Sequence, residues 1–186
     1  MTDFVALLGT KGGPAIRQGS PMPTSSLLSL AGQWVVVDCG LGVTKGLVDQ
    51  GFALKDLSLI FITHLHSDHY LELGPLIHTA WTAGLKTPVR IWGPSGLPRY
   101  WHGFLASMQE DIATRIEDEG RPDLAGLVSF GLIAADAPIA EAGLTVTALP
   151  SIHLPLTESW SLSFRAGDRH VVFSGDTAHN PALAAF

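Results

Sequence analysis

The stretch Ile60-Phe61-Ile62-Thr63-His64-Leu65-His66-Ser67-Asp68-His69 places three imidazoles and a carboxylate directly after an apolar run. That run is typical of a strand covered on both faces. Residues two apart in an extended segment point the same way, so we expect His64 and His66 to bind one ion together. Asp68 and His69 follow where the chain turns into a helix and would face a neighbouring position. Imidazole with carboxylate suits zinc or, less specifically, manganese or iron.

Two segments that are distant in sequence offer further candidate ligands. His153 follows a strand that ends at Leu149-Pro150, and Ser174-Gly175-Asp176-Thr177 closes another apolar strand. Loops after strands commonly carry functional residues in α/β domains. Each segment alone is weak, because an aspartate after a glycine can also be a simple helix cap. Solvated histidines in a polar loop are the alternative for the central cluster, and four ligand-type residues at this spacing disfavour it.

The order of apolar runs predicts an α/β layered domain. We expect helices over residues 43–50, 71–83 and 97–119. Expected strands cover 4–8, 26–30, 34–37, 57–62, 89–92, 144–149, 160–164 and 171–174, with a tight hairpin between the second and third. The Gly- and Pro-rich stretch 12–23 is expected to be a loop.

The composition of the chain indicates the broad class of protein. The chain of 186 residues is 46% hydrophobic and 15% charged, so we expect one folded domain over residues 1–186. A formal net charge of -6 argues against a broad nucleic-acid surface. No apolar run is long enough to span a membrane, and the start of the chain does not resemble a signal peptide. Cys39, the sole cysteine, is compatible with a cytoplasmic location and reads as a small buried residue.

Together these motifs resemble the metallo-β-lactamase superfamily, whose HxHxDH motif is matched by His64, His66, Asp68 and His69. The resemblance extends through LGT at 8–10, DCG at 38–40, His153 and GDT at 175–177. It implies an αβ/βα four-layer sandwich. It also implies a hydrolase whose nucleophile is a water molecule activated by metal.

The family pattern also assigns roles to residues of this chain. It makes His64, His66 and His153 the ligands of one zinc ion, and Asp68 and His69 ligands of a second, with Asp176 bridging both. Asp38 would orient a ligand imidazole, or it would only make local backbone bonds. Asp68 is also a candidate catalytic residue that passes a proton to the leaving group. Among the other histidines, His179 is the candidate to contact substrate.

The opening of the chain resembles the ribonuclease Z and arylsulfatase-like branch, which implies cleavage of a phosphodiester or sulfate ester. Arg17 is followed by Gln18 where ribonuclease Z usually has Arg-Asn, and the arm that grips transfer RNA is not evident between Arg99 and Leu144. We therefore expect a small anionic ester rather than transfer RNA. A lactonase or other carboxylic-ester hydrolase is the alternative enzyme.

The family fold continues beyond GDT to a further histidine ligand, whereas this sequence stops at Phe186. The resemblance thus predicts a fold that is incomplete at its C-terminus, with a weakened second metal site. An unpaired sheet edge would favour self-association, so we expect a homo-oligomer. A truncated, non-catalytic metal-binding module is the hypothesis from a different class.

Overall fold

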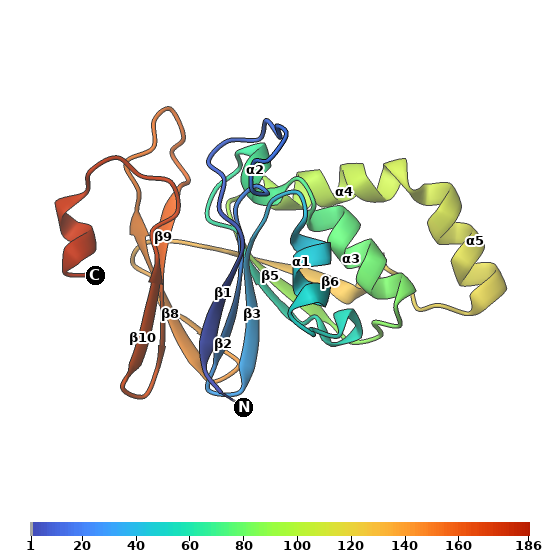
Figure 1. Cartoon of the computed structure of the whole chain (residues 1–186). Coiled ribbons are helices and arrows are strands. Elements are labelled where there is room, and N and C mark those ends of the chain that lie inside the picture. The colour runs from blue at the N-terminus through green and yellow to red at the C-terminus, as the bar shows by residue number, and fades with distance from the viewer. Residues whose placement is uncertain (1) are drawn as a thin grey trace.

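The computed structural model describes residues 2–186, and a six-stranded sheet lies at its centre (Figure 1). The strand order is β1-β2-β3-β4-β5-β6, antiparallel from β1 to β3 and parallel from β3 to β6. The strands are β1 (Phe4–Gly9), β2 (Ser25–Leu30), β3 (Gln33–Cys39), β4 (Leu59–Phe61), β5 (Val89–Gly93) and β6 (Val128–Leu132). The predicted hairpin is confirmed between β2 and β3, whose turn carries positive φ angles at Ala31 and Gly32.

A second, antiparallel sheet packs against the first. Its order is β10-β9-β8-β7, formed by β7 (Ile139–Glu141), β8 (Leu144–Pro150), β9 (Trp160–Ala166) and β10 (Arg169–Phe173). The sequence pattern predicted β8, β9 and β10 but missed β6 and β7. The first of these is interrupted by Gly131 and is only partly buried, and the second has three residues, so neither gives a clear apolar pattern.

The helices lie on the other face of the six-stranded sheet (Figure 1). They are α1 (Val43–Asp49), α2 (Ser67–Tyr70), α3 (Leu73–Thr82), α4 (Leu97–Ser107) and α5 (Gln109–Glu119), with short 3-10 turns at Leu54–Asp56, Ala125–Leu127 and Pro181–Ala184. The prediction of one helix over 97–119 was wrong, because the chain turns at Met108 (φ -105°, ψ 10°). That turn lets Trp101 of α4 and Ile112 of α5 reach the same core.

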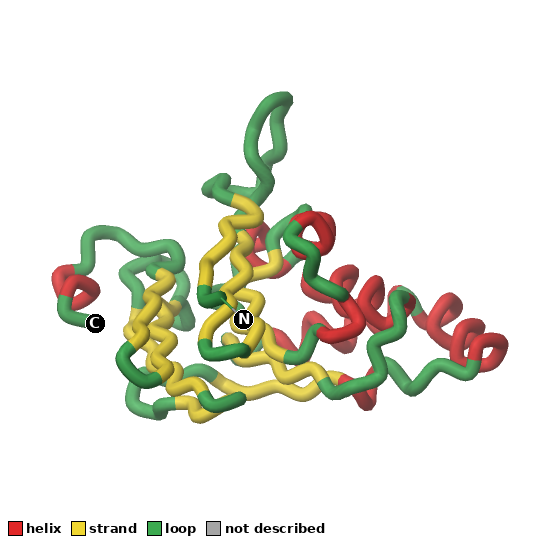
Figure 2. Tube along the Cα trace, turned by 60° about the horizontal axis from the view of Figure 1, so that its bottom comes forward, coloured by secondary structure: helices red, strands yellow, loops and turns green. Residues whose placement is uncertain are grey.

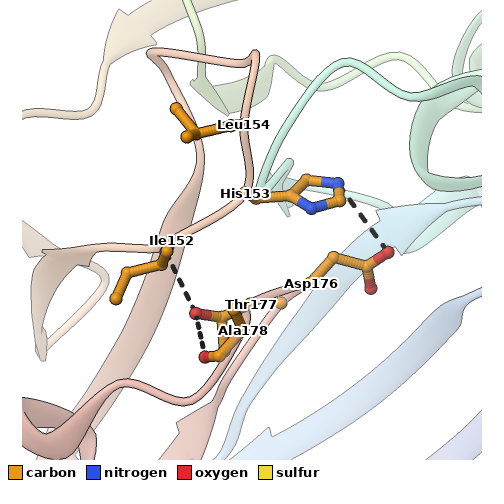
Figure 3. A pocket seen from close by; sticks show the side chains of 7 residues that line it. Ile152, His153, Leu154, Asp176, Thr177 and Ala178 are labelled. Atoms are coloured by element: carbon orange, nitrogen blue, oxygen red, sulfur yellow. Dashed lines mark hydrogen bonds and ion pairs between the residues drawn. The ribbon is translucent and has the colours of Figure 1, made fainter.

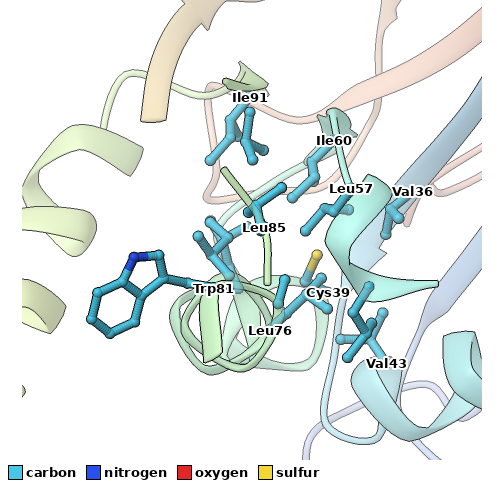
Figure 4. Close-up of a cluster of buried hydrophobic side chains, with 14 of the residues drawn as sticks. Val36, Cys39, Val43, Leu57, Ile60, Leu76, Trp81, Leu85 and Ile91 are labelled. Carbon is cyan, nitrogen blue, oxygen red and sulfur yellow. The ribbon is translucent and has the colours of Figure 1, made fainter. Parts of the chain in front are cut away.

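Strand β4 explains the apolar run that precedes the histidines. Ile60 and Ile62 face the core beneath the helices, where Figure 4 shows Ile60 among Leu57, Leu76 and Ile91. Leu59 and Phe61 point the other way, into the core between the two sheets. Burying each such side chain contributes roughly 1.5 to 3 kcal/mol. The segment that carries the histidines is therefore held from both sides.

Three of the four expected layers lie within residues 2–186: the helices, the six-stranded sheet and the four-stranded sheet. In Figure 2 the helices gather on one side, apart from the short turn Pro181–Ala184 beside the second sheet. Within residues 2–186, β10 is hydrogen-bonded to β9 alone and is an edge strand. The expected self-association stays a prediction. No helix in this part of the chain is long and apolar enough to cross a membrane.

Candidate metal centre

The predicted ligands meet at one end of the two sheets because each follows the carboxyl end of a strand. Asp38 lies at the end of β3, and His64 to His69 follow β4. These two strands are parallel neighbours, so their ends share one edge. His153 follows β8 and Asp176 follows β10, and these strands run in the same direction on either side of β9. The packing of one sheet on the other brings both pairs of loops together.

Two glycines allow the loops to approach this closely. A Cβ atom on Gly40 would lie 2.3 Å from the carbonyl oxygen of Asp68, which is too close for any side chain. Gly175 has φ of 56°, and a Cβ atom there would lie 2.8 Å from the carbonyl oxygen of Trp160. Only glycine fits both the space and, at position 175, the left-handed backbone. The DCG and GDT motifs therefore have a steric reason for their glycines.

The side chains form two groups that could hold metal ions. In the first, ligand atoms of His64, His66 and His153 lie within 4.8 Å of one another; in the second, those of His64, His69 and Asp176 do. The Nε2 atom of His153 is 3.0 Å from Nδ1 of His66. His64 contributes to both groups, so the two candidate positions are adjacent.

Asp176 belongs to the second group and also approaches the first. Its Oδ1 atom is 3.5 Å from Nε2 of His69, and its Oδ2 atom is 4.0 Å from Nε2 of His153 (Figure 3). Each carboxylate oxygen thus faces a different group, as a bridging ligand requires. An open pocket of about 580 Å³ lies beside it, lined by residues 152–154 and 175–178.

Two buried nitrogens test whether these residues fit a metal. The Nε2 atoms of His64 and His69 have no hydrogen-bond partner among residues 2–186, and both side chains are fully buried. An unsatisfied buried polar atom costs about 1 to 3 kcal/mol. Such atoms call for an explanation, and both belong to the groups described above. Two buried imidazoles that each have an unpartnered Nε2 atom and that group with the Asp176 carboxylate fit a metal centre.

Asp38 fixes the orientation of one of these imidazoles. Its carboxylate accepts hydrogen bonds from the backbone N–H of Thr63 at 2.8 Å and from the Thr63 hydroxyl at 3.0 and 3.1 Å. Its Oδ2 atom is also 2.8 Å from Nδ1 of His69. A proton held on Nδ1 leaves the lone pair of Nε2 free, which is the arrangement that metal-ligating histidines use. The contact is more than a local backbone bond, because Asp38 lies in β3 and His69 lies in α2.

The surroundings shift the pKa values of two histidines in opposite directions. Burial, together with the neighbouring imidazoles of His69, His153 and His66, lowers the pKa of His64 to about 3. Burial alone would also lower the pKa of His69. The hydrogen bond and charge of Asp38, with the charges of Asp176 and Asp68, outweigh that effect and raise it. At neutral pH, His64 is therefore the neutral imidazole that metal binding needs.

Asp68 is placed differently from the other expected ligands. Its Oδ2 atom accepts a hydrogen bond from the backbone N–H of Gly13 at 2.7 Å and lies 3.7 Å from Nε2 of His69. The carboxylate is beside the second group rather than within it. It fastens the glycine-rich loop between β1 and β2 to the site. Neither its ligand role nor its catalytic role follows from this geometry, and both stay predictions.

His179 lies next to the pocket lining, whereas Cys39, which follows Asp38, lies in the core. His179 is exposed and follows Ala178, the last residue that lines the pocket. Its contact with substrate stays a prediction. Burial, together with the charges of Asp38 and Glu72, raises the pKa of the Cys39 thiol well above its usual value. This thiol is a buried core residue, as expected.

Several contributors were not anticipated from the sequence. The Thr63 hydroxyl donates a hydrogen bond to Asp38, and the Thr177 hydroxyl accepts one from the backbone N–H of Ile152 at 3.0 Å. Glu72 accepts hydrogen bonds from the backbone N–H groups of Gly42 and Thr44 at the start of α1. Thr63 and Thr177 stand next to predicted ligands, and that adjacency is the only signal that the sequence offered.

The helical layer on one sheet, the second sheet behind it and the metal groups at the strand ends define a metallo-β-lactamase fold. The same fold is found in YhfI from Bacillus subtilis, with a TM-score of 0.69 at 21% identity over 96% of this chain and 64% of that one. The short form of human tRNase Z gives a TM-score of 0.67 at 21% identity, over 94% of this chain and 69% of that one.

The chain belongs to the family described as anti-Pycsar protein Apyc1, whose model matches residues 5–186. It is also similar to ribonuclease Z of Mycobacterium sp. (strain KMS), at 33% identity over 97% of this chain and 64% of that protein. Ribonuclease Z of Mycobacterium bovis (strain BCG / Pasteur 1173P2) is 30% identical over 93% of this chain and 62% of its own length. The chain thus spans less than two thirds of the length of these relatives.

Proposed function

We propose that this protein is a metal-dependent hydrolase that cleaves a phosphodiester. The observation that carries the proposal is the pair of adjacent ligand groups, which share His64 and are linked by Asp176. In two-metal hydrolases, neighbouring ions hold both the attacking and the leaving oxygen of the bond that is cleaved. Each of the two groups would hold one ion.

Zinc is the metal that we propose, because the donors are imidazole and carboxylate, although manganese and iron share this preference. His64, His66 and His153 would hold one ion. His69, Asp176 and, by resemblance, Asp68 would hold the other. Bound zinc would supply an activated water as nucleophile and would polarise the ester.

The other residues of the site would prepare these ligands and the substrate. Asp38 would keep the Nδ1 proton on His69, so that Nε2 is available to metal. Asp68, 3.7 Å from Nε2 of His69, would pass a proton to the leaving oxygen, as the resemblance implies, while its contact with Gly13 holds the loop. His179, one residue beyond the pocket lining, would contact the part of the substrate that does not react.

The choice of a phosphodiester as the bond that is cleaved rests on the proteins to which the chain is similar. The relatives quoted above are both named ribonuclease Z. A ribonuclease acts on RNA, whose backbone is linked by phosphodiesters. A diphosphatase from the PhnP family shares the fold, with a TM-score of 0.59 at 17% identity, over 86% of this chain and 61% of that one. The negative charge of the chain, -6, favours a small anionic ester over transfer RNA. We propose that the protein works in the cytoplasm and as a homo-oligomer.

A panel of substrates tests the proposal. The zinc-loaded protein is assayed with bis(p-nitrophenyl) phosphate, p-nitrophenyl sulfate, a chromogenic lactone and a transfer RNA precursor. We expect the phosphodiester to be hydrolysed fastest, with loss of activity in the His66→Ala variant. Fastest turnover of the sulfate or the lactone would replace the phosphodiester with that bond. Loss of activity on every substrate with retention of zinc would support the non-catalytic metal-binding module.

A further inference from the structure

His153 and Asp176 come from strands that are not neighbours. Strand β9 lies between β8 and β10 in the second sheet. Because adjacent strands are about 4.8 Å apart, the two strand ends are separated by roughly 10 Å. The carboxylate of Asp176 nevertheless lies 4.0 Å from Nε2 of His153. Because β8 and β10 are not paired with each other, contacts between the two loops bear on the spacing of the two ligands.

A small set of hydrogen bonds joins the two loops next to the ligands. The backbone N–H of Ile152 donates to the Thr177 hydroxyl at 3.0 Å (Figure 3). The backbone N–H of Ala178 donates to the carbonyl oxygen of Ile152 at 2.8 Å. The Thr177 hydroxyl in turn donates to the carbonyl oxygen of Ala178 at 2.9 Å. Ile152 directly precedes His153, and Thr177 directly follows Asp176. We call these three hydrogen bonds the clasp. They join the immediate neighbours of both ligands.

The opposite end of the His153 loop is held separately. Glu158 accepts hydrogen bonds from the backbone N–H of Ser95 at 3.1 and 3.2 Å and from its hydroxyl at 2.6 Å. This contact joins the loop to the segment after β5, away from Asp176. It cannot set the spacing between the two ligands. Two more hydrogen bonds join the same loops, from the Ser151 hydroxyl to the carbonyl oxygen of Ser174 at 3.4 Å and from Nδ2 of Asn180 to the carbonyl oxygen of Pro150 at 3.2 Å. The bonds at Thr177 differ from these in that they involve the immediate neighbours of both ligands.

We propose that Thr177 is a positioning residue that couples His153 to Asp176, so that the two metal groups form together. The inference rests on the proposed metal binding and goes beyond it by naming what sets the bridging geometry. A threonine that made only a local turn would bond to Ala178 and no further. The bond from Ile152, 25 residues away in sequence, is what a local role does not explain.

The hydroxyl can be removed with little change of shape. Thr177→Val keeps the branched side chain but can neither accept from Ile152 nor donate to Ala178. Thr177→Ser keeps the hydroxyl and should rescue the defect. Thr145→Val is the matched control, because Thr145 is exposed on β8 at the end of the strand away from the site. Thr177→Ala offers a second deletion of the hydroxyl if the valine variant does not fold.

The readout is binding of cobalt(II), followed by calorimetry and by the visible spectrum of the bound ion. We expect Thr177→Val to lower affinity about 10- to 100-fold and to alter the spectrum, as loss of an orienting contact does. The serine variant and the Thr145 control should bind like the parent, with unchanged circular dichroism in all variants. Parent-like affinity and spectrum in both Thr177→Val and Thr177→Ala would overturn this inference and leave the proposed function standing. Failure of the parent itself to bind cobalt would overturn the proposed function and, with it, this inference.

Discussion

Replacing Asp38 with asparagine should disturb the metal centre without disturbing the backbone. Asp38 has φ of 62°, a left-handed conformation that asparagine also tolerates. The side chains have nearly the same shape, but the amide has one acceptor oxygen where the carboxylate has two. If that oxygen stays with the backbone N–H of Thr63, the amide N–H₂ group faces Nδ1 of His69. The imidazole would then carry its proton on Nε2, the atom directed at the metal.

The expected effect on metal binding is a loss of affinity of about 10- to 100-fold, the usual result of removing such a contact. Stability should fall as well, because a hydrogen bond to a buried charged group contributes about 1.5 to 3 kcal/mol. The pKa of His69 is raised in the folded protein. The stabilisation from its charged form is therefore complete below its ordinary pKa of about 6.5 and is lost as the pH rises through the raised value. The metal-free variant should lose more stability at acid pH than at alkaline pH.

Zinc titration by calorimetry and urea unfolding of the metal-free protein at two pH values measure these effects. Asp49→Asn is the control, because Asp49 pairs with Lys45 on the exposed side of α1. Such surface pairs contribute about 0.3 to 0.5 kcal/mol. Parent-like zinc affinity in Asp38→Asn, with equal loss of stability at both pH values, would refute the assigned role of Asp38.

Three further substitutions test single parts of the site. His153→Ala should lose one bound ion by elemental analysis, since that group then keeps only two imidazoles; full zinc content would remove His153 from the centre. Asp176→Ala should lower turnover about a hundredfold or more while leaving the melting temperature near that of the parent, because the side chain is 38% exposed. Unchanged turnover would exclude a bridging role. Gly40→Ala should cost about 3 kcal/mol in urea unfolding, because its Cβ atom would lie 2.3 Å from the carbonyl oxygen of Asp68. Parent-like stability would contradict that steric argument.

The sequence predicted those parts of the fold that have long, regular apolar patterns. The run at 57–62 is buried on both sides, and its apolar side chains record that burial directly. The break between the helices at Met108 cannot be seen in the sequence, because the apolar pattern of α4 continues into α5. Strand β7 has three residues, too few to show an alternation. Short elements and changes of direction depend on packing that the local sequence does not specify.

The site was predictable where ligand types cluster and unpredictable where backbone atoms take part. The spacing of His64, His66 and His69 indicated metal binding without reference to any partner. The hydrogen bonds from Gly13 to Asp68 and from Ile152 to Thr177 use backbone N–H groups, which every residue except proline has. No residue type marks such donors in a sequence. Their contribution became visible only when the loops were placed in space.

Metal content of the purified protein, measured together with phosphodiester hydrolysis before and after treatment with a chelator, tests the central claim most directly. The two ligand groups predict two zinc ions per chain, loss of hydrolysis when they are removed and recovery when zinc is restored. A protein that carries no bound metal, and that hydrolyses the phosphodiester at the same rate with or without the chelator, would contradict the account.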